Sequence, residues 1–505
     1  MKKKYIGLTI GPIYKTLKNA KKTRELWGGS YIFSYIMKLV IKSFKDRKFV
    51  IPYVTSTDKE FERLLSDKMS VGIFHDRLIF KSENNDFDKL KSGIDKILAE
   101  IAGQIAGHIK ADKYAVISYI KAYFQLYFCE IEFDENAGYK KINKEINGYL
   151  DSFELQESFI PEEEKNYVAE FLLNIKNSFL FKEAFEKNIR FKSVTEIAAA
   201  SLNLKNINTD NYKLIFENYD EKNKDEDYDI YQHIKDEYKI NNIKQHCKYM
   251  AIVHADGDYM GDTIEGLENN KEFKAFSKKL FDFDLSAHEA IKDFGGETIF
   301  AGGDDLLFFA PVVNKDETVF DLLNTINNIF NERFINMKKK LTLSFGISIS
   351  YHKFPLYEAL EISRDLLKRA KEMKHKNAAA FRILKHSGQY FEAVFEKQST
   401  EYASLLKLLE NGGQEKEDEK LMSSIIYTLF SSRALLEAVG NDKPRLDNFF
   451  KNSFNEPIHK ISHNESQIES IKELIYAVYQ SGNYKKEERT RIIYSTLRLN
   501  KFIRG

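Results

Sequence analysis

The spacing of apolar and polar positions changes along this chain between two periods. Alternation with a period of two predicts strands, and a period of about 3.6 predicts helices. In the N-terminal part the order is strand, helix, strand, strand, helix, strand, and the same order returns between residues 249 and 384. Such βαββαβ units are typical of ferredoxin-like modules. We therefore predict an α+β fold with two ferredoxin-like modules, and we expect them to pack face to face.

The boundaries of the predicted elements follow from these periods. In the first module we predict strands at Tyr5–Ile10, Phe49–Val54, Val71–Phe80 and Phe124–Phe133, with helices at Tyr14–Phe44 and Phe87–Ile109. In the second module we predict strand Tyr249–Ala255, a helical run to Phe294, hairpin Glu297–Pro311, helix Val319–Lys340, strand Leu341–Ser350, helix Leu356–Met373 and strand Ala378–Leu384.

The segments between and after the modules have mostly helical patterns, and helices are again expected from about Gln389 onward. Two charged runs, 218–229 (NYDEKNKDEDYD) and 415–420 (EKEDEK), predict solvated loops. The predicted domains are the first ferredoxin-like module (1–134), a mostly helical middle domain (135–245), the second module (246–389) and a helical C-terminal domain (390–505).

Composition narrows the class of protein. A chain of 505 residues suggests about three or four domains. The 77 Lys and Arg nearly cancel the 76 Asp and Glu, so nucleic acid would have to bind through local patches or partner subunits. With Cys129 and Cys247 as the two cysteines, we expect neither a disulfide framework nor a zinc ribbon. The absence of a signal peptide or a long apolar run predicts a cytoplasmic protein that does not bind membranes.

The candidate chemistry lies in two motifs, AIVHADGDYMG at 251–261 and ETIFAGGDDLLFFAP at 297–311. In the first, an apolar strand ends in Asp256-Gly257-Asp258, and in the second, a tight hairpin carries Gly302-Gly303-Asp304-Asp305. Crowded carboxylates repel one another unless a divalent cation neutralises them. Two Mg²⁺ or Mn²⁺ ions at such a site activate a ribose hydroxyl and stabilise departing pyrophosphate.

We predict that Asp256, Asp304 and Asp305 are catalytic and bind metal, with Asp258 as a further ligand. Two simpler interpretations stay open. The GGDD motif could be a hairpin turn with solvated aspartates, and Asp258 could orient a neighbouring group or face solvent.

The second module resembles the palm of GGDEF cyclases and, more closely, the GGDD palm of the large subunit of type III CRISPR effector complexes. The likeness continues through Ser344-Phe345-Gly346-Ile347, Phe354-Pro355-Leu356, the helix end Leu367–Lys371, and Asn377. It implies that ATP is the substrate and that Lys371 reaches its triphosphate. The alternatives are an exposed helical lysine and a Ser344 hydroxyl bonded to backbone. The residues expected to bind nucleotide are Gly257, Gly302, Gly303, Ser344, Lys371, Arg24, Gly29 and Ser30.

The first module resembles the first palm of the type III-B (Cmr) version of that subunit. The likeness lies in Ile10–Ile13 and in the segment Ala20–Ser30, which contains the sole tryptophan, and the C-terminal run 496–505 also fits the family. Without a GGDD motif, this module is expected to be catalytically silent and to help bind the second nucleotide. Core packing of Trp27 against glycines is the alternative.

The resemblance also has departures. Many members begin with an HD nuclease domain, whereas here the first palm starts at residue 5, so we expect a form without that nuclease. His75-Asp76 spells HD, but we interpret it as part of a strand. The cysteines that bind zinc between the palms of some relatives are absent as well.

The resemblance implies a signalling enzyme that works with crRNA, target RNA and the other subunits of a type III-B complex. Target RNA would activate nucleotidyl transfer from ATP to give cyclic oligoadenylate. An alternative is AMP transfer to S-adenosylmethionine as co-substrate, giving SAM-AMP. Two further alternatives are a stand-alone GGDEF-like cyclase and a non-catalytic scaffold subunit.

Overall fold

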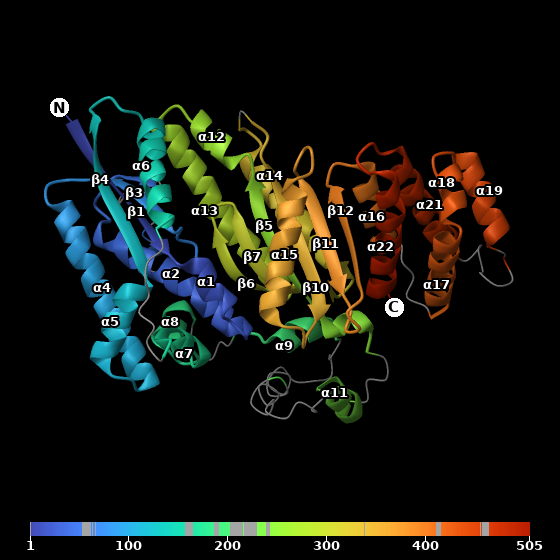
Figure 1. Ribbon diagram of the computed structural model, residues 1–505, viewed down its shortest axis with the longest axis horizontal. Helices are drawn as coiled ribbons and strands as arrows, with labels where there is room; N and C mark the ends of the chain where they lie inside the picture. Colours follow the sequence, from blue (N-terminus) through green and yellow to red (C-terminus); the bar gives the residue numbers. More distant parts are fainter. Residues whose placement is uncertain are drawn as a thin grey trace.

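The computed structural model is elongated, with the first module, the second module and the C-terminal helices following one another along its long axis (Figure 1). It describes residues 2–504 apart from 53–61, 63, 66, 157–164, 186–190, 203–215, 217–229, 239–242, 338, 411–415, 455 and 457–463. Within these ranges, the helices are too short or too polar to cross a lipid bilayer.

The first module is ferredoxin-like, as predicted. Its strands β1 (Lys2–Gly11), β2 (Phe49–Ile51), β3 (Arg77–Lys81) and β4 (Gln125–Asp134) pair in the order β2-β3-β1-β4. Its helices are α1 (Ile13–Lys18), α2 (Thr23–Ser43), α4 (Asp86–Ile109) and α5 (Lys113–Tyr123). The predicted helix 14–44 is therefore two helices. The Glu25 side chain accepts hydrogen bonds from the backbone N–H groups of Lys21 and Lys22, which caps the start of α2 as a separate helix.

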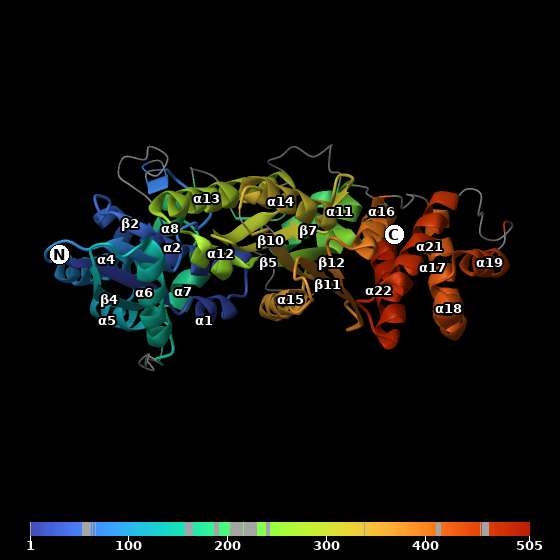
Figure 2. The same ribbon diagram turned by 90° about the horizontal axis from the view of Figure 1, so that it is seen from above.

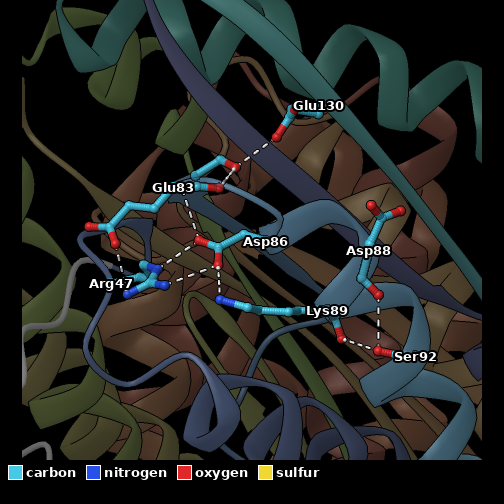
Figure 3. Close-up of polar contacts among 8 residues, drawn as sticks. Arg47, Glu83, Asp86, Asp88, Lys89, Ser92 and Glu130 are labelled. Atoms are coloured by element: carbon cyan, nitrogen blue, oxygen red, sulfur yellow. Dashed lines mark hydrogen bonds and ion pairs between the residues drawn. The ribbon is translucent and has the colours of Figure 1, made fainter.

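A buried ion pair anchors the start of α4 (Figure 3). Asp86 is fully buried and accepts from Arg47 Nε at 2.6 Å and Nη2 at 3.0 Å. Its carboxylate also accepts from the Glu83 backbone at 2.8 Å. Because two parallel bonds fix both partners, this pair ties the loop after α2 to the helix that follows β3.

The predicted strand 71–80 is wrong over its first six residues, because β3 begins only at Arg77. Within residues 71–76, Asp76 O still accepts from Ile10 N of β1 at 3.0 Å, but other backbone groups bond elsewhere. Gly72 O accepts from Ala301 N of the second module at 3.4 Å, and Phe74 N donates to Ser34 Oγ at 2.9 Å. This segment therefore leaves the first sheet before Asp76 and contacts both α2 and the second module.

The middle region is mostly helical where the structure describes it, as predicted. It contains α6 (Tyr139–Glu154), α7 (Tyr167–Leu173), α8 (Phe179–Ala184), α9 (Val194–Ala198), η1 (Ala199–Ser201), α11 (Ile230–Tyr238) and η2 (Gln245–Lys248). Helix α6 packs on β1 and β4 of the first sheet. The charged run 218–229, predicted as a loop, lies outside the described residues.

The second module contains the same ferredoxin-like core with two strands added. Its sheet has the order β12-β11-β10-β5-β7-β6. The strands are β5 (Tyr249–Asp258), β6 (Glu297–Gly302), β7 (Asp305–Pro311), β10 (Thr342–Tyr351), β11 (Ala378–Leu384) and β12 (Tyr390–Glu396), and β8 (Val313–Asn314) pairs with β9 (Glu317–Thr318) beside it. The helices are α12 (Met260–Gly266), α13 (Asn270–Asp293), α14 (Val319–Phe334) and α15 (Leu356–Lys371). Helices α13 and α14 cover one face of the sheet, and α15 covers the other (Figure 2).

The prediction of helix from residue 390 onward is wrong for β12. In Tyr390–Glu396 the residues Phe391, Ala393 and Phe395 are buried at a spacing of two, and the segment pairs with β11 along its length. The alternation of a strand was present but short. The sheet therefore extends past the predicted domain boundary at 389.

The C-terminal part is helical after β12. It comprises α16 (Thr400–Glu410), α17 (Lys416–Ser431), α18 (Arg433–Val439), α19 (Lys443–Ser453), α21 (Glu465–Gln480) and α22 (Lys486–Arg504). Helix α22 packs on β12 and so joins these helices to the second sheet. The charged run 415–420 was predicted to be a loop, but it is helical from Lys416 on, since Glu and Lys are good helix formers.

Candidate metal and nucleotide site

Three carboxylates gather where β5 ends beside the β6–β7 hairpin. Strands β5 and β7 pair from Met250 opposite Pro311 to Ala255 opposite Leu306, which brings the end of β5 next to the turn. Among the described residues, Asp256, Asp304 and Asp305 each offer an oxygen, and these oxygens lie within 4.8 Å of one another. The structure therefore brings together the three residues predicted to be catalytic.

Glycines make this approach possible. A Cβ on Gly257 would lie 2.7 Å from Asp304 Cβ and 2.8 Å from its Oδ2, so a side chain here would displace the carboxylate. Gly303 has φ +76°, a conformation that glycine adopts without steric cost. A Cβ on Gly303 would also collide with the ring of His75. These two glycines thus shape the site, and their contact with nucleotide stays a prediction.

The crowding perturbs the protonation of the cluster. Burial and the nearby Asp256 raise the pKa of Asp304 from 3.8 to about 7. Asp305 touches solvent, yet desolvation by the surrounding protein and repulsion from Asp304 and Asp256 raise its pKa well above the usual range. A bound divalent cation stabilises the anionic form of carboxylates whose pKa is raised in this way. The donor set therefore fits Mg²⁺ or Mn²⁺, which prefer oxygen ligands.

Lys371, at the end of α15, lies in the site as predicted. Its Nζ forms an ion pair with Asp256 and donates to Gly257 O at 3.1 Å. The ammonium lowers the pKa of both Asp304 and Asp305 and so offsets part of the repulsion. Its reach to a triphosphate stays a prediction.

Asp258 and Ser344 do not lie with the cluster, and their roles as metal ligand and nucleotide contact stay predictions. Both side chains are fully buried. Asp258 accepts from Thr342 Oγ1 at 2.8 Å, from Ser344 Oγ at 2.9 Å and from Asn377 N at 2.9 Å. Ser344 Oγ also accepts from Ala378 N at 3.3 Å. These bonds connect β5 and β10 to the start of β11, so both residues hold the sheet together beneath the site.

The glycine-rich part of α2 packs between α1 and α7 of the middle region. A Cβ on Gly29 would touch Thr16 and Leu172 at 3.4–3.5 Å, and Ser30 is buried. This packing agrees with the alternative of a role in the core, and the prediction that Gly29 and Ser30 bind nucleotide stays a prediction. Arg24 is half-buried in the first turn of α2, and its predicted role stays a prediction.

The first module contributes an acid that the sequence interpretation missed. Asp76, in the irregular segment before β3, lies close enough to contribute to the raised pKa of Asp305, and burial raises the pKa of Asp76 itself. The neighbouring His75 is surrounded by protein, and burial lowers its pKa to about 4. The His-Asp pair was visible in the sequence but was assigned to a strand. Only the contact between the modules shows that this pair lies beside the Gly302–Asp305 turn.

The fold and this cluster define a class of protein with two palm modules and an acidic turn between them. Residues 249–380 match the family model for the second palm domain of Cas10/Cmr2. Residues 5–112 match the model for the N-terminal part of the CRISPR-associated protein Cmr2. The resemblance to the large subunit of type III-B complexes that we predicted from the sequence is thereby confirmed.

Individual relatives agree with these matches. The CRISPR system Cmr subunit Cmr2 of Pyrococcus furiosus is 32% identical over 196 residues, which are 33% of this chain and 22% of that protein. The aligned region thus spans about a fifth of that relative's length.

Solved structures share the fold at low sequence identity. Type III-B Cmr-beta bound to cognate target RNA has a TM-score of 0.64 at 13% identity, covering 100% of this chain and 83% of that chain. The Csm1–Csm4 cassette in complex with one ATP has a TM-score of 0.53 at 11% identity, covering 94% and 70%. The same cassette in complex with cA4 has a TM-score of 0.51 at 10% identity and the same coverage.

Proposed function

We propose that this chain is the large subunit of a type III-B CRISPR effector complex and that its second palm transfers nucleotidyl groups from ATP. The observation that carries the proposal is the cluster of Asp256, Asp304 and Asp305 at a GGDD turn. A scaffold subunit gains nothing from carboxylates that repel one another, because the repulsion lowers its stability. The solved Csm1–Csm4 cassette with ATP supports the choice of donor.

The reaction needs little covalent chemistry from the protein. Asp256, Asp304 and Asp305 would hold two divalent cations, which supply activation of a ribose hydroxyl and stabilise the pyrophosphate that leaves. Gly257 leaves room for Asp304 to approach β5 closely. Lys371 keeps a positive charge beside Asp256, where the phosphates of a bound nucleotide would add negative charge.

The proposed product is cyclic oligoadenylate. Each transfer joins a 3′ hydroxyl to the α-phosphorus of the next nucleotide and releases pyrophosphate, and a final transfer closes the ring. The second nucleotide would lie against the first module, whose segment 70–76 borders the GGDD turn. The cassette bound to cA4 supports this product.

AMP transfer to S-adenosylmethionine is a second candidate. S-adenosylmethionine carries a sulfonium and an ammonium group, and Asp76 of the first module lies close enough to the cluster to contribute to the raised pKa of Asp305. The donor ATP and the carboxylate cluster would serve both reactions alike.

The partners are part of the proposal. We infer that crRNA, target RNA and the other type III-B subunits assemble on this chain, and that target RNA activates the second palm. The Cmr-beta structure bound to cognate target RNA supports this arrangement. The near-zero net charge of +1 suggests that RNA binding depends on local patches and on the partner subunits.

The test is a product analysis of the assembled complex with guide, matching target RNA, Mg²⁺ and labelled ATP, with and without S-adenosylmethionine. Mass spectrometry that finds oligoadenylate rings without the methionine cofactor supports the cyclase. A single adduct that requires both substrates supports the AMP transferase. The double variant Asp304→Ala, Asp305→Ala should abolish either product while the complex still assembles. A wild-type complex that binds target RNA but forms neither product would leave the scaffold as the better explanation, whereas cyclic di-GMP made from GTP by the isolated chain would favour the stand-alone cyclase.

A further inference from the structure

A fourth aspartate lies directly behind the acidic turn. Asp284 projects from the middle of α13 and is fully buried, with 0% of its surface exposed. Its Oδ2 accepts from the backbone N–H of Gly303 at 3.0 Å. Its Oδ1 has no hydrogen-bond partner among the described residues. Asp284 is not one of the three clustered carboxylates, so the metal site does not explain it.

Burial of this carboxyl would be costly if it were ionised. A buried anion needs a cation or several donors to compensate for the lost hydration, and the backbone N–H of Gly303 is the donor that Asp284 has. Burial, together with the nearby Asp304 and Asp305, raises the pKa of Asp284 well above its usual range. Burial therefore favours the protonated form of this carboxyl, and its Oδ2 accepts from the turn.

The hydrogen bond from Gly303 to Asp284 acts at the residue that decides the shape of the Gly302–Asp305 turn. Gly303 lies between the paired residues Gly302 and Asp305 and has φ +76°. If the peptide between Gly302 and Gly303 rotated, the N–H would point away and the two carboxylates that follow would move with it. The hydrogen bond to Asp284 opposes this rotation. The His75 ring of the first module lies against Gly303 as well.

We propose that Asp284 is a positioning residue that fixes the Gly302–Asp305 turn and thereby holds Asp304 and Asp305 in place to bind divalent cations. This inference rests on the proposed function, because it takes the carboxylate cluster to be a metal site. Asp284 itself touches neither metal nor substrate in this scheme.

Three variants of the full chain test the role through Mn²⁺ binding, followed by electron paramagnetic resonance without any nucleotide. Asp284→Asn matches the neutral acid in shape and keeps the accepting oxygen, so its dissociation constant for Mn²⁺ should stay within about threefold of wild type. Asp284→Ala removes the acceptor and should weaken Mn²⁺ binding by about 10- to 100-fold, as is usual for partners that orient metal ligands. Asp293→Ala, an exposed acid at the end of the same helix, is the control and should bind as wild type does.

The outcomes separate this inference from the proposed function. Equal Mn²⁺ affinity of the Ala variant and wild type would overturn the positioning role. Weak Mn²⁺ binding by Asp284→Asn would also overturn the positioning role, since a charged ligand would then be required. This result would overturn the role even if the Ala variant does not fold. A wild-type chain that binds Mn²⁺, but whose assembled complex makes no nucleotide product with guide and matching target RNA, would refute the proposed function and leave the role of Asp284 intact.

Discussion

Replacing Asp304 with Asn should stabilise the metal-free chain at pH 8 while it removes activity. The pKa of Asp304 is raised from 3.8 to about 7 in the folded chain. Between these values the unfolded chain loses the proton while the folded chain keeps it, so folding becomes less favourable as the pH rises. Above pH 7 the whole loss is present. Asparagine has the same shape and no charge, so the variant escapes this loss.

The magnitude follows from the difference of about three pH units, which corresponds to about 4 kcal/mol as an upper limit. The side chain is half-buried, and solvent screening reduces the effect to about 1 to 2 kcal/mol. For a domain of the size of the second palm, this shifts the unfolding temperature upward by about 2 to 8 °C.

Scanning calorimetry of the full chain in EDTA at pH 8 and pH 5 measures the effect. The variant should unfold at a higher temperature than wild type at pH 8, and the gap should narrow at pH 5, where Asp304 of the folded wild type is protonated. Adding Mn²⁺ should stabilise wild type, by about 2.7 kcal/mol at a hundredfold excess over the dissociation constant, and should leave the variant nearly unchanged. A variant that is no more stable than wild type at pH 8 would refute the argument that these carboxylates are crowded.

Three further predictions concern residues around the cluster. Asp258→Ala should lower the free energy of unfolding by at least about 3 kcal/mol, because three buried donors lose their acceptor; an unchanged thermal melt would contradict this network. Gly303→Ala should lower the free energy of unfolding by about 1 to 2 kcal/mol from its positive φ alone and should reduce nucleotide turnover. The control Gly388→Ala, at a glycine with φ +81° and open space around it, should keep turnover normal. Similar turnover in both variants would argue against a fixed turn. Lys371→Met should lower turnover about 100-fold, while the exposed Lys368→Met on the same helix should not; equal kinetics for the two would remove Lys371 from the site.

The sequence predicted the two ferredoxin-like modules because short apolar runs of strand length are separated by longer segments whose apolar residues recur at the helical period. Central strands such as β7 are buried on both faces, so they are nearly continuous apolar runs. The same spacing predicted the hairpin that carries Asp304 and Asp305, since two apolar strands flank two glycines. It failed at β12, where seven residues of alternation precede a long helical region. Its partner β11 is the strand just before it in the chain, so β12 was missed because seven residues give too short an alternation beside the helical pattern that follows.

The sequence could not separate Asp256 from Asp258. Both lie near the end of one strand, two residues apart, and alternation alone would give them the same environment. The neighbouring β10 decides the difference, because its Thr342 and Ser344 hydroxyls donate to Asp258 and leave Asp256 for the cluster and Lys371.

Other features of the site depend wholly on the contact between modules. The segment 70–76 has the composition of a strand, yet Gly72 bonds to the second module and the His75 ring lies against Gly303 of the acidic turn. The buried position of Asp284 depends equally on α13 lying behind the β6–β7 hairpin. The sequence by itself determined which local structures form and which acids could bind metal. The tertiary structure decided which acids meet, because hydrogen-bond partners and desolvation come from segments that are far apart along the chain.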